Sequence, residues 1–162
     1  MRAVLTGLMC LSAAGCLYHL SGGGLPAHIK TIAVLPFENE TATPELQREL
    51  NEALRKGIAS RLGLHEAPED KASAIVRGTI VRYEVDAPVA FSANPAQATS
   101  ARRQLKVVVD VEIVDQSTGK SLWKGTGISA LGDYAENAEA AGRKQAVDRL
   151  VNLVIEGAQS QW

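Results

Sequence analysis

The alternation of apolar and polar residues over positions 105–113 constrains the fold of this 162-residue chain more than any other feature. Successive side chains of a strand point to opposite faces of a sheet, so a period of two predicts a strand with one buried and one hydrated face. The turn sequence DQSTGK at 115–120 and the apolar start of 122–128 follow, which predicts an antiparallel hairpin. The apolar members of 105–113 are Leu105, Val107, Val109, Val111 and Ile113, and they alternate with Lys106, Asp110 and Glu112.

Two further segments are expected to be strands. Residues 75–89 have one face expected in the core, and with the hairpin they would form a three-stranded antiparallel meander. Residues 29–35 are β-branched and apolar up to Pro36, which predicts a buried strand, and residues 36–41 are expected to turn the chain. In 75–89, the alternating sets are Thr79, Val81, Tyr83 and Val85 on one face and Ile80, Arg82, Glu84 and Asp86 on the other.

Two helices complete the predicted domain. The first begins with Thr43 as N-cap and Pro44 at the first helical position, carries apolar residues at spacings of three and four, and stops at Gly63. The second is expected over residues 134–158, ended by Gly157. The order β-α-β-β-β-α predicts an α+β two-layer sandwich, in which two helices pack on one face of a four-stranded, mostly antiparallel sheet.

The amino terminus is typical of an exported lipoprotein. Arg2 precedes an apolar run too short to span a membrane, and small residues follow it. The sequence AAGC at 13–16 resembles the bacterial lipoprotein signal, in which the chain is cut before the cysteine and that cysteine is acylated. We therefore expect residues 1–15 to be a removed signal peptide, Cys16 to be lipidated, residues 16–28 to be a tether to the membrane, and residues 29–162 to form a single domain.

Composition and motifs exclude several functional classes. A formal net charge of −1 gives no basic field for nucleic acid, and an aromatic content of 4% argues against a base- or sugar-stacking surface. His19, His28 and His65 are isolated, so no metal site is expected. No nucleophile elbow or phosphate-binding loop occurs. The sequence predicts a protein that is not an enzyme and needs no cofactor.

The connection between the second and third strands is unusual because residues 87–101 carry no charge. One interpretation is a small-residue loop that simply lacks charge. The other is a hairpin tip that enters a partner or touches lipid, with Phe91 as its apolar contact and basic residues that bind phosphate by charge-assisted hydrogen bonds. The candidate basic residues are Arg102, Arg103 and Lys106, with Lys124 on the neighbouring strand as a secondary candidate.

Several segments together resemble the lipopolysaccharide-assembly lipoprotein family LptE. They are residues 16–22, 25–26, 29–34, 36–41, 76–80 and 109–112, with Tyr83, Trp123, Tyr134 and the terminal helix in matching order and spacing. Leu17 stands where the family usually has glycine. The resemblance implies a protein that plugs the lumen of the outer-membrane β-barrel LptD, helps that barrel assemble and binds lipopolysaccharide on its way to the outer leaflet.

Two short stretches of the sequence bear on the membrane location of the protein and on an alternative function. Leu17 is not the aspartate that retains many lipoproteins at the inner membrane, which favours a lipid anchor at the outer membrane, on the periplasmic side. The resemblance to LptE implies that the domain lies in the barrel lumen. The sequence IAVLPF at 32–37 also resembles other periplasmic lipoproteins, namely activators of peptidoglycan synthases and curli-secretion lipoproteins. A lipoprotein partner of such an envelope machine is therefore the alternative hypothesis.

Overall fold

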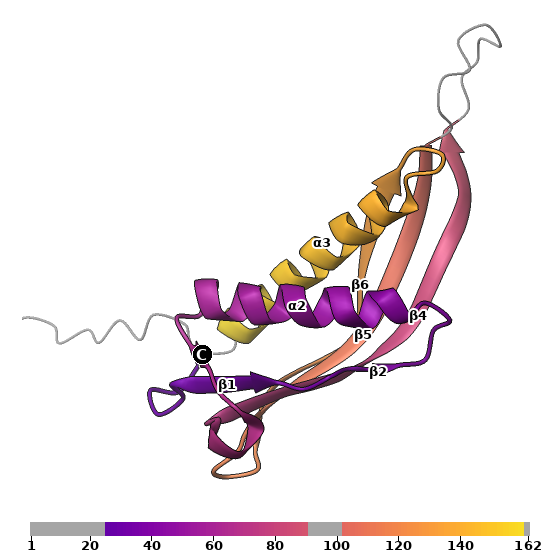
Figure 1. The fold of residues 1–162 in the computed structure, drawn as a ribbon. Coiled ribbons are helices and arrows are strands. Elements are labelled where there is room, and N and C mark those ends of the chain that lie inside the picture. The colour runs from indigo at the N-terminus through magenta and orange to yellow at the C-terminus, as the bar shows by residue number, and fades with distance from the viewer. Residues whose placement is uncertain (1–24, 91–101, 161–162) are drawn as a thin grey trace, which may run out of the picture.

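The computed structural model describes residues 25–90 and 102–160 (Figure 1). Cys16, Phe91 and the predicted signal peptide lie outside this part of the chain. The elements follow one another as β1 (Thr31–Val34), β2 (Glu38–Asn39), α2 (Pro44–Arg61), β3 (His65–Glu66), the 3-10 helix η2 (Glu69–Lys71), β4 (Ala74–Ala90), β5 (Arg102–Asp115), β6 (Ser121–Tyr134) and α3 (Glu139–Ser160).

The strands form one mixed sheet in the order β3-β1-β4-β5-β6, with β2 beside β4. The long pairs β4–β5 and β5–β6 are antiparallel, whereas β1 pairs with β3 and β4, and β2 with β4, in parallel. The fold is α+β, but the prediction of four strands is wrong because the sheet has six. The two additional strands are two residues long, too short to carry a periodic pattern, and only their backbone pairing defines them.

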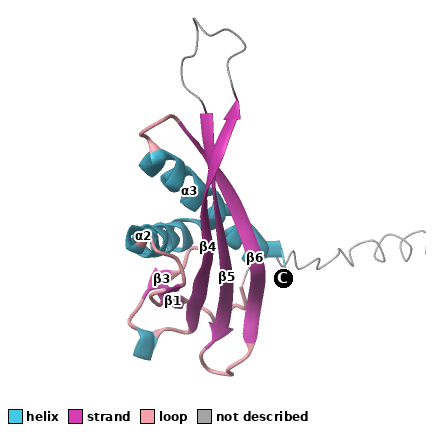
Figure 2. Ribbon diagram, turned by 90° about the vertical axis from the view of Figure 1, so that its right-hand side faces the viewer, coloured by secondary structure: helices cyan, strands magenta, loops and turns pink. Residues whose placement is uncertain are grey.

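The helices lie on the same side of the long strands β4, β5 and β6 in Figures 1 and 2. Each helix buries one stripe of side chains in a core that it shares with the sheet. All five apolar members of the alternating segment 105–113 are buried, so its predicted register is confirmed. The buried stripes are Leu46, Leu50, Leu54 and Ile58 of α2, and Ala146, Val147, Leu150, Val151, Val154, Ile155 and Ala158 of α3.

The sequence predicted the limits of the first helix correctly, but not those of the second. Helix α2 begins at Pro44 and is capped at Leu62, before Gly63 with φ +63°, as predicted. The expected start of the second helix at residue 134 is wrong, because β6 continues to the buried Tyr134, which pairs with Arg103. Gly157 does not end α3 either. A Cβ at Gly157 would lie 2.5 Å from Cζ2 of Trp123, so this glycine lets the indole pack against the helix.

A β-bulge changes which residues of β4 face the core. The pairing moves from Ile80↔Val109 to Arg82↔Val108, leaving Val81 without a register partner. Ile80 is fully buried before the bulge, and Tyr83 lies on the inner face after it, opposite the buried Val107. The prediction that Thr79, Val81, Tyr83 and Val85 form one continuous face is therefore wrong, because the bulge inverts the alternation.

The segment after β1 is fixed by a contact between Phe37 and Gly78. The Phe37 side chain is fully buried, and a Cβ on Gly78 would lie 2.6 Å from its Cε1 atom and 2.2 Å from the Asp110 carbonyl oxygen. Gly78 therefore provides the space in which the ring packs. The backbone of Phe37 is held from α2 as well, since Gln47 Nε2 donates to its carbonyl oxygen at 2.5 Å.

Strand β6 is the terminal strand of the sheet, and α3 covers part of its open edge. Gln145 Oε1 accepts a hydrogen bond from the backbone N–H of Asp133 at 2.7 Å. Arg149 Nη1 donates to the carbonyl oxygen of Leu131 at 2.6 Å. Side chains of α3 thus occupy backbone groups on the carboxyl-terminal half of β6.

The β4–β5 hairpin and the described chain ends lie at opposite ends of the molecule (Figure 1). Residues 32–34 pair with residues 74–76 at the beginning of β4, and the hairpin leaves from the other end of that strand. A 17-residue strand spans roughly 50 Å. The segment that would continue toward the predicted tether is therefore far from the hairpin.

Candidate functional site

The root of the β4–β5 hairpin brings together one of the predicted basic residues and a buried tyrosine. Arg103 pairs with Tyr134 across β5 and β6, and its guanidinium Nη2 lies 3.9 Å from Glu136 Oε1. Arg103 Nε and the Tyr134 hydroxyl are buried and have no hydrogen-bond partner within residues 25–90 and 102–160. Val85, 48% exposed, lies opposite Leu105 two positions along β5. This end of the sheet offers two unpaired polar groups next to an exposed apolar side chain.

The other predicted basic residues are not gathered there. Lys106 is half-buried at a strand position of opposite parity to Arg103, so it lies on the other face of the sheet. Lys124 pairs with Glu112, six residues along β5 from Lys106, or roughly 20 Å. Arg102 is the first residue of β5, and its side chain, like Phe91, lies outside the description. The structure thus separates Arg103, Lys106 and Lys124.

A network of charged and polar side chains, which the sequence prediction missed, lies next to this root. Arg143 of α3 makes two hydrogen bonds to Glu49 of α2, Nε to Oε2 at 2.9 Å and Nη2 to Oε1 at 3.0 Å. Its Nη1 lies 3.7 Å from Glu139, whose Oε1 accepts a 2.5 Å hydrogen bond from the Tyr83 hydroxyl of β4. The contacts therefore join a strand and both helices.

The electrostatics of this network follow from burial and pairing. The two hydrogen bonds to Glu49 raise the pKa of Arg143, so its guanidinium stays charged with only 13% of the side chain exposed. Burial, and then the bond to Glu139, raise the pKa of the Tyr83 hydroxyl, which therefore remains a hydrogen-bond donor. A sequence signal existed: Arg143 precedes Ala146, Val147 and Leu150 at spacings of three, four and seven, which places it on the apolar stripe of α3.

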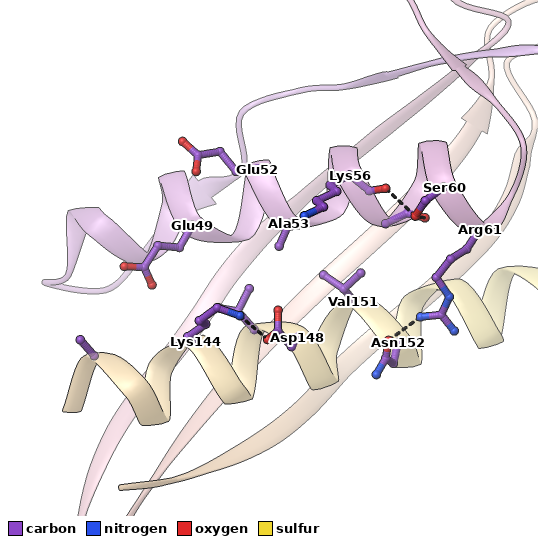
Figure 3. A pocket seen from close by; sticks show the side chains of 13 residues that line it. Glu49, Glu52, Ala53, Lys56, Ser60, Arg61, Lys144, Asp148, Val151 and Asn152 are labelled. Atoms are coloured by element: carbon purple, nitrogen blue, oxygen red, sulfur yellow. Dashed lines mark hydrogen bonds and ion pairs between the residues drawn. The ribbon is translucent and has the colours of Figure 1, made fainter. Parts of the chain in front are cut away.

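A groove of about 660 Å³ lies between α2 and α3. Its floor consists of small and apolar residues, and charged side chains form its rims (Figure 3). Arg61 donates a hydrogen bond to Asn152 across one end, and Lys144 pairs with Asp148 along α3 at 2.8 Å. The floor residues are Ala53, Gly57, Val147 and Val151. Of the predicted site residues whose side chains the structure describes, Arg103, Lys106 and Lys124, none lines this groove.

At the far end of the molecule, a buried carboxylate holds the segment before β1. His28 Nε2 lies 2.9 Å from Asp115 Oδ2. His28, which is isolated in the sequence, therefore has a carboxylate partner in the fold. Asp115 also accepts hydrogen bonds from Ser117 N and Oγ at 2.8 and 2.7 Å. The bonds from Ser117 and His28 hold the pKa of Asp115 well below its ordinary value. The carboxylate thereby fastens the chain start to the β5–β6 turn.

Two negative observations concern the same residues, 25–90 and 102–160. No three of their histidine and acidic side chains gather closely enough to hold a metal ion. No helix in this part of the chain combines the length and apolar character that crossing a membrane requires.

Comparison with known proteins gives one family and several structural relatives. The family model LptE, described as lipopolysaccharide-assembly, matches residues 29–156. No curated protein matches the sequence. Among solved structures, the PelC dodecamer from Paraburkholderia phytofirmans has 17% identity and a TM-score of 0.55, covering 85% of this chain and 94% of that chain. The hypothetical protein CT253 from Chlamydia trachomatis has 13% identity and a TM-score of 0.56, covering 81% and 96%. At such identities these relatives support the fold alone.

Proposed function

Since this chain belongs to the lipopolysaccharide-assembly family LptE, we propose that it is an outer-membrane lipoprotein that plugs the barrel LptD, helps it assemble and binds lipopolysaccharide. The observation that carries the proposal is the family match, which runs from two residues before β1 to the last turns of α3. LptE is a family of non-enzymatic lipoproteins. The acylated Cys16 would hold the protein at the periplasmic side of the membrane, with the domain in the barrel lumen.

The separation of the two ends supports this arrangement. A tether that joins the domain beside β1 leaves the hairpin about 50 Å away, free to reach into a partner while the acyl chains stay in the leaflet. Several acyl chains on one cysteine make such an anchor lasting, because each buried CH₂ contributes about 0.8 kcal/mol.

The sheet face that the helices leave uncovered has the polarity that a barrel lumen requires. Arg77 donates two hydrogen bonds to Glu112, at 3.0 and 2.8 Å, and Lys124 pairs with Glu112 across the strands. The bonds from Arg77 lower the pKa of Glu112, so the carboxylate remains charged. Since the interior of an outer-membrane barrel is polar, charged side chains on this face can pair with its wall.

For lipopolysaccharide, the root of the hairpin is the favoured contact. The Arg103 side chain, 38% exposed, offers a guanidinium for a phosphate, and Val85 offers apolar surface for an acyl chain. Arg102 and Phe91 remain candidates around this centre, whereas Lys106, on the other face of the sheet, would make a separate contact. Lys124 lies too far along the sheet to contact the same phosphate, so we assign it to a separate contact.

Co-purification tests the plug. The mature protein, extracted in detergent, is expected to bring down an outer-membrane β-barrel. A peptidoglycan synthase or a curli-secretion pore in its place would support the alternative hypothesis and refute the plug.

A charge reversal tests the lipid contact. The double substitution Arg102→Asp and Arg103→Asp is expected to weaken lipopolysaccharide binding about tenfold or more, while Lys120→Asp, in the turn at the other end of the sheet, should leave it unchanged. High salt should weaken wild-type binding, since the Debye length falls from about 10 Å at 0.1 M to about 3 Å at 1 M. A folded double variant with wild-type affinity would remove these arginines from the site.

A further inference from the structure

The network of Tyr83, Glu139, Arg143 and Glu49 runs from the hairpin to both helices. Tyr83 follows the bulge of β4, Glu139 is the first residue of α3, and Arg143 connects it to α2 through Glu49. The hydrogen bond from the Tyr83 hydroxyl to Glu139 joins β4 directly to α3. We call these four residues the brace.

The part of β4 beyond the brace, residues 84–90, pairs irregularly with β5. The register of β4 shifts between Val85 and Pro88 and again between Pro88 and Ala90. Strand β6 follows β5 as far as Arg103, but on its other side β4 pairs with β2 only as far as Ile80, so among the described residues the arm has β5 as its one strand neighbour. The order of such an outer strand depends on its side-chain contacts as well as on that single ladder. We call this part the arm.

We propose that the brace positions the arm, so that Tyr83 and Glu139 act as positioning residues for the partner and lipid contacts at the hairpin. The use of the arm for these contacts rests on the proposed function, whereas the effect of the brace on the order of the arm does not. The brace is suited to this task because Arg143 is nearly buried and held by two hydrogen bonds, which fixes Glu139 from the helix side. The acceptor for Tyr83 is therefore in place before the arm docks.

The raised pKa of Tyr83 supports this assignment. A phenol that stays protonated can donate to the Glu139 carboxylate across the whole neutral range. A hydrogen bond to a charged acceptor that is partly withdrawn from water is stronger than one between neutral groups. Loss of this single hydroxyl should consequently release the arm without removing apolar surface from the core.

Hydrogen exchange of the intact mature protein in detergent micelles tests the order of the arm. Tyr83→Phe and Glu139→Ala should each speed exchange of the arm amides at least about tenfold, while amides of residues 74–80 and 108–115 keep wild-type rates. Glu139→Gln retains an acceptor oxygen and should stay within about twofold of wild type. Tyr134→Phe is the matched control, because it removes a hydroxyl that has no partner among residues 25–90 and 102–160.

The outcomes separate this proposal from the proposed function. Wild-type exchange in Tyr83→Phe, or an equal acceleration over all strands, overturns the brace. A Tyr134→Phe variant that loosens the arm as much would also overturn it, because loss of any hydroxyl would then suffice. Capture of a barrel by the wild-type protein tests the proposed function independently. If the wild-type protein brings down the barrel, the Tyr83→Phe variant should bring down less of it, and the Glu139→Gln variant should bring down as much as the wild type. A variant with a loosened arm that still brings down the wild-type amount refutes the positioning role.

Discussion

Replacing Gly78 with alanine should be among the most damaging single-methyl changes in this protein. The new Cβ would lie 2.2 Å from the carbonyl oxygen of Asp110 on the neighbouring strand and 2.6 Å from Cε1 of Phe37. The carbonyl oxygen belongs to the β4–β5 ladder, and the ring is fully buried, so neither can move without loss of pairing or packing. Overpacking of this kind lowers the free energy of unfolding by about 1–3 kcal/mol. Because both neighbours are rigid, we expect a loss of about 3 kcal/mol for Gly78→Ala.

Urea or thermal unfolding of the mature protein measures this cost. A loss of about 3 kcal/mol lowers the melting temperature by roughly 10 °C in a domain of this size. Gly119→Ala is the control: its φ is +69° and no atom lies within 4 Å of its added Cβ, so only backbone strain of about 1 kcal/mol applies. Adding Phe37→Leu to Gly78→Ala should cost less than the two single effects combined, since the smaller side chain relieves part of the clash. A Gly78→Ala protein as stable as the Gly119→Ala protein would refute the steric argument.

Three further predictions concern other parts of the chain. Val109→Asp should unfold the domain, because an unpaired carboxylate would replace a fully buried methyl pair at a cost of several kcal/mol, whereas Asp110→Asn retains an acceptor for Gly127 N and should change the melting temperature little. Asp115 has a lowered pKa, so its stabilising contribution is complete above the ordinary carboxyl pKa of about 3.9 and is lost as the pH falls; Asp115→Asn should flatten the acid limb of a stability-against-pH curve. Cys16→Ala should abolish fatty-acid labelling and release the protein from membranes that lack its partner, and continued labelling would exclude lipidation at this residue.

Much of the fold could be predicted because the side-chain period is a direct consequence of backbone geometry. In 105–113 the apolar positions recur every second residue, and the structure buries each of them. The helix from Pro44 was equally clear, since a proline at the first turn and a glycine past the end mark both limits. These features depend on local sequence alone.

The boundary between β6 and α3 could not be predicted in this way. The length of β6 is set by its partner, since its last residue pairs with Arg103 at the beginning of the β5 pairing. The residues before α3 are small or polar and are compatible with either a strand or a helix. Likewise, β2 and β3 exist because β4 and β1 offer free edges, which is a property of the assembled sheet.

The candidate site illustrates a different limit. Arg103 and Lys106 were grouped because they are close in sequence, yet an odd separation in a strand places them on opposite faces. The alternation of the predicted strand already indicates this separation. The brace is harder to predict, because Glu49, Tyr83 and Arg143 come from three elements and meet only in the folded chain. The spacing of Arg143 on the stripe of α3 was the one available signal.

The contacts of Gln145 and Arg149 with β6 also bear on solubility. A terminal strand of 14 residues offers unpaired amides and carbonyls on which a second chain could add as a further strand, and such addition can continue into fibres. Because α3 side chains bond to Asp133 N and the Leu131 oxygen, the free protein presents a shorter template for polymerisation. Helix α3 thus protects the edge of the sheet from pairing with other chains. Shortening α3 should therefore cause the protein to aggregate under conditions in which its domain is still folded.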